Sequence, residues 1–232
     1  MKSDGKEYNL GYFKIYPAPV FEAVFNEAVS SINTTIMTYA PMLYFMARSI
    51  DAFNVLEIGI AQGWTSFFLA SAVKDNGIRH KVEAMYYGND IFEERQEVID
   101  NLHARGLPAT FLCKDSLELK RSDFPANPDF KLELAFIDGW HSTGHILREF
   151  DFIYPMIRDK GQGYIVLHDA YAFGEEAIKE IVKTYKKVEY IRFMNNYGLA
   201  IFRKMDNYDF EKSYWPSGPM KPEYPEKKEC LR

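Results

Sequence analysis

The sequence predicts a doubly wound α/β fold, with helices on both faces of a mostly parallel sheet. Three observations support this prediction. An apolar run that begins at Val55 ends in a glycine turn and continues into a helical pattern, as expected for a buried strand followed by a helix. Similar runs and helical patterns then alternate along the chain. Two of the later runs end in ionisable side chains, near Asp138 and His168.

Composition is typical of one globular domain with short additions. The 232 residues are 47% hydrophobic and 16% aromatic, enough to bury a sizeable core. The net charge is −5 and basic residues are scattered among acids, so a nucleic-acid partner is not expected. The chain has no apolar leader and no uncharged apolar run of about 18 residues, so we expect a cytoplasmic protein that is not bound to a membrane. Its two cysteines, Cys113 and Cys230, have neither metal-site spacing nor a disulfide pattern.

Two helices are expected before the first strand. Apolar residues recur at helical spacing from Val20 to Ile32 and again from Ile36 to Ile50. Polar residues separate the two series, and Pro41 either starts or kinks the second helix. We therefore predict an N-terminal helical region over residues 1–54.

The stretch from Val55 to Gly63 predicts a nucleotide-like ligand. A glycine turn exposes backbone N–H groups at a helix N-terminus and lets a ligand approach closely. A dinucleotide fingerprint would read G-x-G-x-x-G, but Ala61 stands between Gly59 and Gly63. The spacing therefore disfavours a nicotinamide cofactor. A helix is expected from Trp64 to Val73.

The next strand is expected to end in an acidic turn. Residues 81–87 alternate as a strand does and lead into Gly88-Asn-Asp90. A carboxylate at this strand end can accept both hydroxyl protons of a ribose, so Asp90 is a candidate ribose ligand. A helix over 92–105 and a short strand over 110–113 follow.

Four ionisable side chains then give the strongest functional signal. One apolar strand ends in Asp138 and His141, and the next ends in His168 and Asp169. Ligands bind at the carboxyl ends of strands in open α/β sheets. We therefore expect these four side chains to converge on one site.

The remaining elements complete the sheet. A helix capped by Ser142 or Thr143 is expected to carry an apolar face up to Ile157 and to end at Lys160-Gly161, and a second helix covers 175–185. The runs 188–193 and 199–202 predict a closing hairpin. Residues 206–232 form a proline-rich arm that is expected to be extended.

Five short motifs follow one another along the chain. They are Glu57-Ile-Gly-Ile-Ala-Gln-Gly63, Asn89-Asp-Ile-Phe92, Lys114-Asp-Ser116, Phe136-Ile-Asp-Gly-Trp-His141 and Val166-Leu-His-Asp169. This series resembles the small class I S-adenosylmethionine-dependent methyltransferases of the IDG-x-H type, over roughly Val55 to Tyr185. Relatives include macrocin-type sugar O-methyltransferases and cephalosporin hydroxylase-like proteins. Trp140 departs from the acid or small residue of many relatives, and the first motif lacks its middle glycine.

The resemblance implies a Rossmann-like, mostly parallel seven-stranded sheet with a closing antiparallel strand, in a cofactor-binding domain over residues 55–205. It implies S-adenosylmethionine as the cofactor and N-terminal helices that cover it or form the face of a homodimer. Asp115 and Ser116 would receive the adenine amino group. The cofactor-binding residues would be Glu57, Gly59, Gly63, Asp90, Asp115, Ser116 and Asp138.

Two mechanisms for methyl transfer remain open at this stage. Transfer to a hydroxyl requires removal of one proton, which suits a histidine, and we favour His141 as the base with His168 as a second catalytic residue. Alternatively, Asp138, His168 and Asp169 align with the magnesium ligands of catechol-type relatives and could hold a divalent metal, although a histidine ligand favours a softer ion than magnesium. The expected acceptor is a small molecule such as a sugar or secondary metabolite.

Two further functions are also compatible with the sequence. One is a metal-dependent hydroxylase or oxidoreductase on the same fold, as the cephalosporin hydroxylase resemblance suggests. The other is a non-catalytic protein that keeps only a nucleotide pocket.

Overall fold

A computed structural model describes residues 8–10, 13–15, 36–171, 174–193 and 198–207. Near the N-terminus, β1 (Tyr8–Leu10) and β2 (Phe13–Ile15) pair as an antiparallel ribbon. The helix predicted over 20–32 and nearly all of the arm predicted over 206–232 lie outside the described residues.

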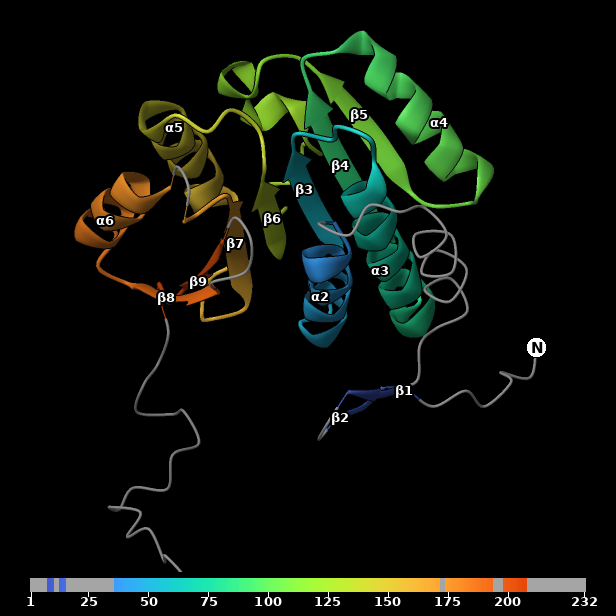
Figure 1. Cartoon of the computed structure of the whole chain (residues 1–232). Coiled ribbons are helices and arrows are strands. Elements are labelled where there is room, and N and C mark those ends of the chain that lie inside the picture. Colours follow the sequence, from blue (N-terminus) through green and yellow to red (C-terminus); the bar gives the residue numbers. More distant parts are fainter. Residues whose placement is uncertain (1–7, 11–12, 16–35, 172–173, 194–197, 208–232) are drawn as a thin grey trace, which may run out of the picture.

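Seven strands form one twisted sheet with the order β5-β4-β3-β6-β7-β9-β8 (Figure 1). Along the chain they are β3 (Asn54–Ile58), β4 (Met85–Asp90), β5 (Ala109–Cys113), β6 (Leu134–Ile137), β7 (Gly163–His168), β8 (Val188–Phe193) and β9 (Leu199–Lys204). All neighbouring pairs from β5 to β7 are parallel, whereas β9 runs antiparallel to both β7 and β8. The predicted sheet, with its seven strands and closing antiparallel strand, is confirmed.

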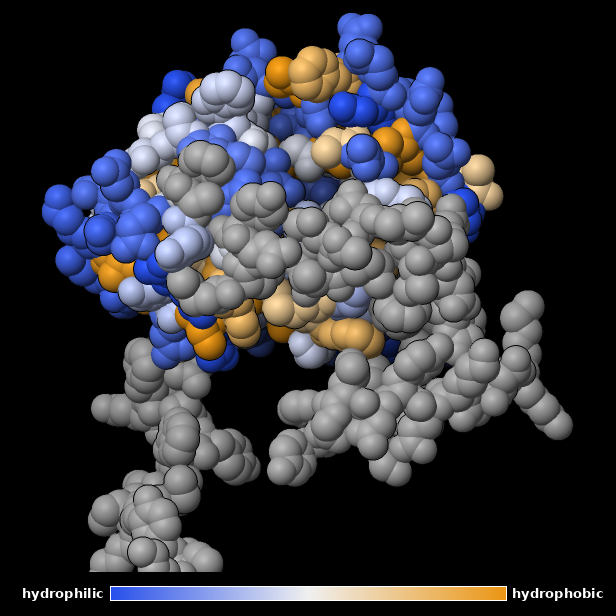
Figure 2. Space-filling view, in the orientation of Figure 1, coloured by the Kyte–Doolittle hydropathy of each residue, from blue (hydrophilic) through white to orange (hydrophobic). Residues whose placement is uncertain are grey.

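Helices cover both faces of this sheet. One face carries α2 (Ile36–Ser49), α3 (Trp64–His80) and α4 (Gln96–Ala104), and the other carries α5 (Thr143–Ile153) and α6 (Glu175–Thr184). Figure 1 shows α2 and α3 side by side in front of the strands, and Figure 2 shows hydrophilic residues covering α6 and the outer side of α4. Four short 3-10 turns complete the fold: η1 (Glu93–Arg95), η2 (Ser116–Glu118), η3 (Arg121–Asp123) and η4 (Tyr154–Met156).

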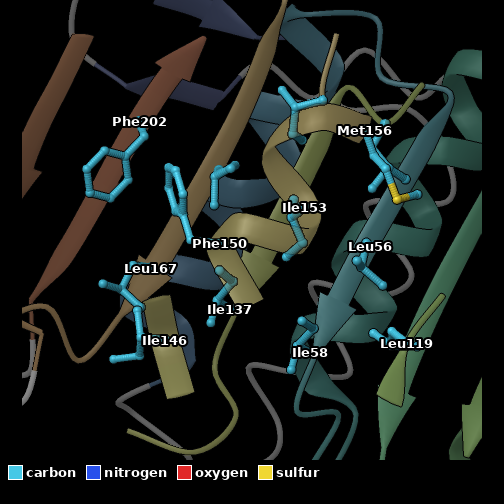
Figure 3. Close-up of a cluster of buried hydrophobic side chains, with 14 of the residues drawn as sticks. Leu56, Ile58, Leu119, Ile137, Ile146, Phe150, Ile153, Met156, Leu167 and Phe202 are labelled. Atoms are coloured by element: carbon cyan, nitrogen blue, oxygen red, sulfur yellow. The ribbon is translucent and has the colours of Figure 1, made fainter. Parts of the chain in front are cut away.

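Strand residues alternate between two hydrophobic cores, one on each face. Val55 packs with α2 and α3, while its neighbour Leu56 packs with α5, because successive side chains of a strand point to opposite faces. Figure 3 shows the second core, in which Phe150 and Ile153 of α5 lie against strand residues such as Phe202. None of the helices in the described ranges is both long and apolar enough to cross a membrane.

Three predicted boundaries are wrong. Helix α3 continues to His80 instead of ending near Val73, and β4 begins at Met85 instead of at residue 81. The polar end of α3 is stabilised by tertiary contacts, since the Asn76 side chain donates to the carbonyls of Ala47 and Ala52 at 3.0 and 2.8 Å. The next predicted helix begins at its predicted cap, Ser142, but ends as α5 at Ile153 and continues as η4, well before the predicted stop at Lys160-Gly161. Pro41, which was expected either to start this helix or to kink it, lies inside α2.

Candidate active site

The carboxyl ends of four adjacent strands lie in one row. Ile58 is opposite Asn89 of β4 and Ile137 of β6, and Ile137 is opposite Leu167 of β7. The residues that stand at the carboxyl end of each strand, or directly after it, therefore share one edge of the sheet, as predicted from the α/β topology. In spatial order they are Asp90, Gly59, Asp138 and His168.

Glycine is required at both ends of the turn after β3. Gly59 has φ +87°, and a Cβ on it would lie 2.3 Å from the carbonyl oxygen of Asp138. Gly63 has φ +81°, and a Cβ there would lie 2.3 Å from Cγ1 of Val98 on α4. Gly59 thus lets β3 pass close to the end of β6, whereas Gly63 lets α3 start against α4.

Asp90 holds this turn in place from the end of β4. Its Oδ2 accepts from the backbone N–H groups of Ile60 at 3.1 Å and Ala61 at 3.3 Å, and its Oδ1 accepts from Phe92 N–H at 3.1 Å. Arg95 Nε lies 4.0 Å from Oδ2. Since Ala61 has φ +47°, a conformation that alanine rarely adopts, these bonds stabilise a strained turn.

A cavity of about 480 Å³ opens along this edge, within the usual range for small-molecule sites. Its wall contains five of the seven predicted cofactor residues: Gly59, Asp90, Asp115, Ser116 and Asp138. The other two, Glu57 and Gly63, line a smaller cavity of about 240 Å³ with Tyr39 and Thr65. The two cavities share Gly59, Ala61 and Asp138 in their walls, so together they offer an elongated site.

Glu57 lies deeper than the other predicted cofactor residues. It is 1% exposed and its Oε2 accepts from Ser66 Oγ at 2.7 Å and from the hydroxyl of Tyr86. Burial raises the pKa of Glu57 to about 8, against the opposing effect of these hydrogen bonds. Its observed contacts are therefore to the protein core, and its role toward a cofactor stays a prediction.

Asp138, His141, His168 and Asp169 converge, as predicted. One ligand-type atom from each residue lies within 4.8 Å of those of the others. His168 Nδ1 is 2.8 Å from Asp138 Oδ1, while His141 Nε2 is 3.0 Å from Asp169 Oδ2 and 3.5 Å from Asp138 Oδ1. We refer to these four residues as the His–Asp cluster.

The cluster's charges stabilise one another. Burial alone would raise the pKa of Asp138, but hydrogen bonds from His141 and His168 outweigh it and lower that pKa. The bond to Asp138 in turn raises the pKa of His141, against the effect of burial and with help from Asp169. His141 is thus a stronger base than a solvated histidine, as expected for an imidazole flanked by two carboxylates.

Tyr39 of α2 connects the N-terminal region to the cluster. Its ring centroid lies 4.6 Å from that of His168 at an interplanar angle of 45°, and its hydroxyl is hydrogen-bonded to Thr65 at the start of α3. Burial raises the pKa of the Tyr39 hydroxyl well above its usual value. The sequence predicted a helix here, but nothing in its apolar pattern distinguished Tyr39 from the other apolar residues of the series.

Because His145 lies one helical turn after His141, the sequence favoured a solvated side chain, and this expectation is wrong. Its side chain is 18% exposed and lines the 480 Å³ cavity. Its Nε2 lies 3.0 Å from Ser116 Oγ and 3.3 Å from Oε1 of Glu149 on the same helix. His103, also expected at the surface, is exposed with Nε2 2.8 Å from the Ala109 carbonyl oxygen. The contact of His145 with Ser116 depends on the docking of α5 beside η2, which residue spacing does not reveal.

Asp115 is exposed and caps η2, since its Oδ1 accepts from Leu117 N–H at 2.9 Å. Ser116 is 7% exposed, and its hydroxyl donates to Glu149 Oε1 at 2.5 Å. Both residues follow β5 and line the 480 Å³ cavity. The Glu149 carboxylate that Ser116 contacts lies near Gly139, the neighbour of Asp138, where a Cβ would approach Oε1 at 3.4 Å.

Comparison with known proteins agrees with this architecture. A family model described as a methyltransferase domain matches residues 56–170. No curated protein sequence matches the chain.

Three solved structures illustrate the similarity of fold. The O-methyltransferase TomG from Streptomyces achromogenes, involved in tomaymycin synthesis and solved with S-adenosylmethionine, has a TM-score of 0.60 at 13% identity, covering 82% of this chain and 92% of that chain. An O-methyltransferase from Bacillus cereus in complex with S-adenosylhomocysteine has a TM-score of 0.58 at 14% identity, with coverages of 82% and 92%. The S-adenosylhomocysteine-bound methyltransferase PaMTH1 from Podospora anserina has a TM-score of 0.59 at 11% identity, with coverages of 82% and 89%. Residues 56–170 therefore match a methyltransferase domain, and the chain shares the fold of solved S-adenosylmethionine-dependent methyltransferases.

Proposed function

We propose that this protein transfers the methyl group of S-adenosylmethionine to a hydroxyl group of a small molecule such as a sugar or secondary metabolite. The observation that carries the proposal is the position of the His–Asp cluster. A histidine of raised basicity lies at the same sheet edge as a nucleotide-sized cavity whose wall contains Asp90. The solved O-methyltransferases of the same fold support the choice of a hydroxyl acceptor.

The order of the strand ends suggests how the cofactor would lie. Asp90 would hold the ribose hydroxyls. The sulfonium would lie near Gly59 and Asp138, toward the base, and the amino-acid end would enter the smaller cavity beside Thr65 and Tyr39. The adenine would then extend toward Asp115 and Ser116 at the end of β5.

His141 would remove the acceptor proton. Methyl transfer is an in-line displacement: the acceptor oxygen forms a bond to the methyl carbon, the carbon–sulfur bond breaks, and its electrons stay on sulfur as S-adenosylhomocysteine leaves. The acceptor O–H proton passes to an imidazole nitrogen of His141, and Asp138 and Asp169 stabilise the resulting imidazolium. His168, held by Asp138 at 2.8 Å, would orient that carboxylate.

The donor set of the cluster also fits a divalent metal. Two carboxylates and two imidazoles within 4.8 Å of one another suit ions that accept mixed nitrogen and oxygen ligands better than they suit magnesium. Asp138, His168 and Asp169 would hold the ion, which when bound would lower the pKa of the acceptor hydroxyl.

We further propose that the protein acts as a homodimer, with the N-terminal region at or near the interface.

Calorimetric titration with S-adenosylhomocysteine tests the cofactor assignment. We expect micromolar binding, at least tenfold weaker binding by Asp90→Asn, and no binding of NADH. Asp129→Asn, which changes an exposed loop carboxylate, is the matched control. Absence of binding to the wild-type protein would contradict the proposal.

A methylation assay with labelled S-adenosylmethionine and a panel of hydroxylated acceptors tests the base. His141→Gln should lower kcat by about 10²- to 10⁴-fold and leave S-adenosylhomocysteine binding within a few fold, while His103→Gln at the surface should change neither. Repeating the assay with a chelator, and then with added manganese or zinc, decides whether the cluster needs a metal. Full activity of His141→Gln would exclude this residue as the base.

One alternative function is favoured by the same cluster. Two histidines beside a carboxylate are the ligands of non-haem iron oxygenases, so a metal-dependent hydroxylase on this fold is the second candidate. It predicts turnover that requires ferrous iron and molecular oxygen and produces no S-adenosylhomocysteine. Methyl transfer under anaerobic conditions would exclude it.

A further inference from the structure

Tyr39 is the residue through which α2 contacts the His–Asp cluster. It lies in the first turn of α2 and is 5% exposed. Its ring centroid is 4.6 Å from that of His168 and 5.8 Å from that of Phe136 on β6, and the centroids of Phe136 and His168 are 6.1 Å apart. These distances are typical of aromatic packing. Two aromatic rings from different elements therefore pack against the imidazole of His168.

The hydrogen bond between His168 and Asp138 has a defined direction. Although burial opposes the effect, hydrogen bonds from His141 and His168 lower the pKa of Asp138, so its carboxylate is ionised near neutral pH and can only accept. His168 Nδ1, 2.8 Å from Asp138 Oδ1, must then carry a proton and donate it. Since His168 is 8% exposed, little water competes for this bond.

Both histidines of the cluster share one oxygen of Asp138. Its Oδ1 lies 2.8 Å from His168 Nδ1 and 3.5 Å from His141 Nε2. A turn of the His168 ring about its Cβ–Cγ bond would withdraw the Nδ1–H from this oxygen. Because torsions of this type have broad minima, contacts with neighbouring side chains are needed to fix the ring plane. The orientation of His168 therefore affects the carboxylate beside the proposed base.

Tyr39 contacts His168 through its ring, whereas its hydroxyl is hydrogen-bonded to Thr65 of α3. Burial raises the pKa of this hydroxyl well above its usual value, so the group stays protonated near neutral pH and does not act as a second base. The bond to Thr65 fixes the far end of the side chain. Tyr39 is thus itself held in place, as a residue that orients its neighbour must be.

We propose that Tyr39 is a positioning residue for the His–Asp cluster. Its ring fixes the plane of His168, so that Nδ1 stays directed at Asp138 and this carboxylate keeps its place beside His141. The consequence for catalysis rests on the proposed function, whereas the effect on the His168 hydrogen bond does not. The inference gives α2 a part in the chemistry of the site in addition to its packing on the core.

Proton NMR of the full chain, with a chelator present, tests the hydrogen bond directly. The Nδ1–H of His168 should give a slowly exchanging signal downfield of the backbone amides, because the bond is to a carboxylate. Loss of the signal in His168→Gln identifies it. Tyr39→Phe keeps the ring and should keep the signal, whereas Tyr39→Leu lacks the ring and should lose it.

A matched control separates this effect from a general loss of stability. Leu102→Ala removes fully buried side-chain atoms from the same hydrophobic core but on α4, so it should destabilise the protein and keep the signal. Tyr39→Met is a second variant without a ring, for use if Tyr39→Leu does not fold. The inference is overturned if the wild-type protein gives no such signal, or if the ring-free variants keep it unchanged.

The methylation assay, at saturating S-adenosylmethionine, measures the consequence for catalysis. Tyr39→Leu should lower kcat by about 10- to 100-fold, since the catalytic groups are displaced, and should change S-adenosylhomocysteine affinity much less. Tyr39→Phe should recover most of kcat. Equal losses of kcat in the two Tyr39 variants would contradict the role given to the ring, as would an equal loss in Leu102→Ala. If the wild-type protein binds no S-adenosylhomocysteine, the proposed function fails, and the NMR comparison still decides the inference separately.

Discussion

Gly59 is the residue at which a single methyl group should most directly disturb the site. Its backbone has φ +87°, and an added Cβ would lie 2.3 Å from the carbonyl oxygen of Asp138, which is backbone and cannot rotate away. Any replacement must therefore push β3 away from β6 at the position where the two cavities meet.

We predict that Gly59→Ala destabilises the fold by about 1–3 kcal/mol or more and weakens S-adenosylhomocysteine binding at least tenfold. Gly144→Ala is the matched control: Gly144 lies in the first turn of α5 with nothing within 4 Å of a built Cβ, so this change should be neutral or stabilise by up to about 1 kcal/mol. Chemical denaturation and calorimetry measure the two effects. Equal stability of both variants would contradict the close approach seen at Gly59.

At the level of elements, α2 is attached to α3 by buried polar contacts as well as by apolar packing. The Tyr44 hydroxyl donates to Asp75 Oδ2 at 2.7 Å, and Arg48 donates to Asn76 Oδ1 at 2.6 Å. Burial raises the pKa of Asp75, against the effect of the Tyr44 bond. Since α2 also carries Tyr39 against His168, the attachment of this helix affects the geometry of the candidate site.

Tyr44→Phe should therefore destabilise the protein by about 1–3 kcal/mol, because it leaves the Asp75 carboxylate buried without its main donor. In the double variant with Asp75→Asn, part of this loss should be recovered, since a neutral amide is less costly to bury. Urea denaturation of the two single variants and the double variant gives the coupling energy. Additive effects would show that the Tyr44–Asp75 bond contributes nothing to stability.

The same elements show what sequence reasoning could and could not predict. Alternating strand and helix patterns predicted the sheet and its closing hairpin, and the shared edge of parallel strands predicted that Asp138, His141, His168 and Asp169 converge. The end of α3 was missed because its polar residues are satisfied by α2, a contact absent from local periodicity. The contact of His145 with Ser116 joins residues 29 positions apart and depends on how α5 docks.

For the molecule as a whole, the central strand carries an unusual buried carboxyl group. Glu57 lies in the middle of the sheet, between β4 and β6, is 1% exposed, and is hydrogen-bonded to Ser66 and Tyr86. Because burial raises the pKa of Glu57 to about 8, the folded state holds this proton over a pH range in which the unfolded chain has released it.

The pH dependence of folding stability should report this group. Between the ordinary glutamate value of 4.5 and the folded value of about 8, the native state binds more protons than the unfolded state, so the free energy of unfolding falls as pH rises through this window. Glu57→Gln keeps an acceptor for Ser66 and Tyr86 but does not titrate. It should therefore flatten the decline, with a difference from the wild-type protein that grows to a few kcal/mol by about pH 8. Glu97→Gln on the exposed side of α4 should follow the wild-type curve, and urea denaturation from pH 5 to pH 9 measures all three. A wild-type curve parallel to that of Glu57→Gln would mean that Glu57 ionises normally in the folded protein, and that the core around Tyr86 admits a charge.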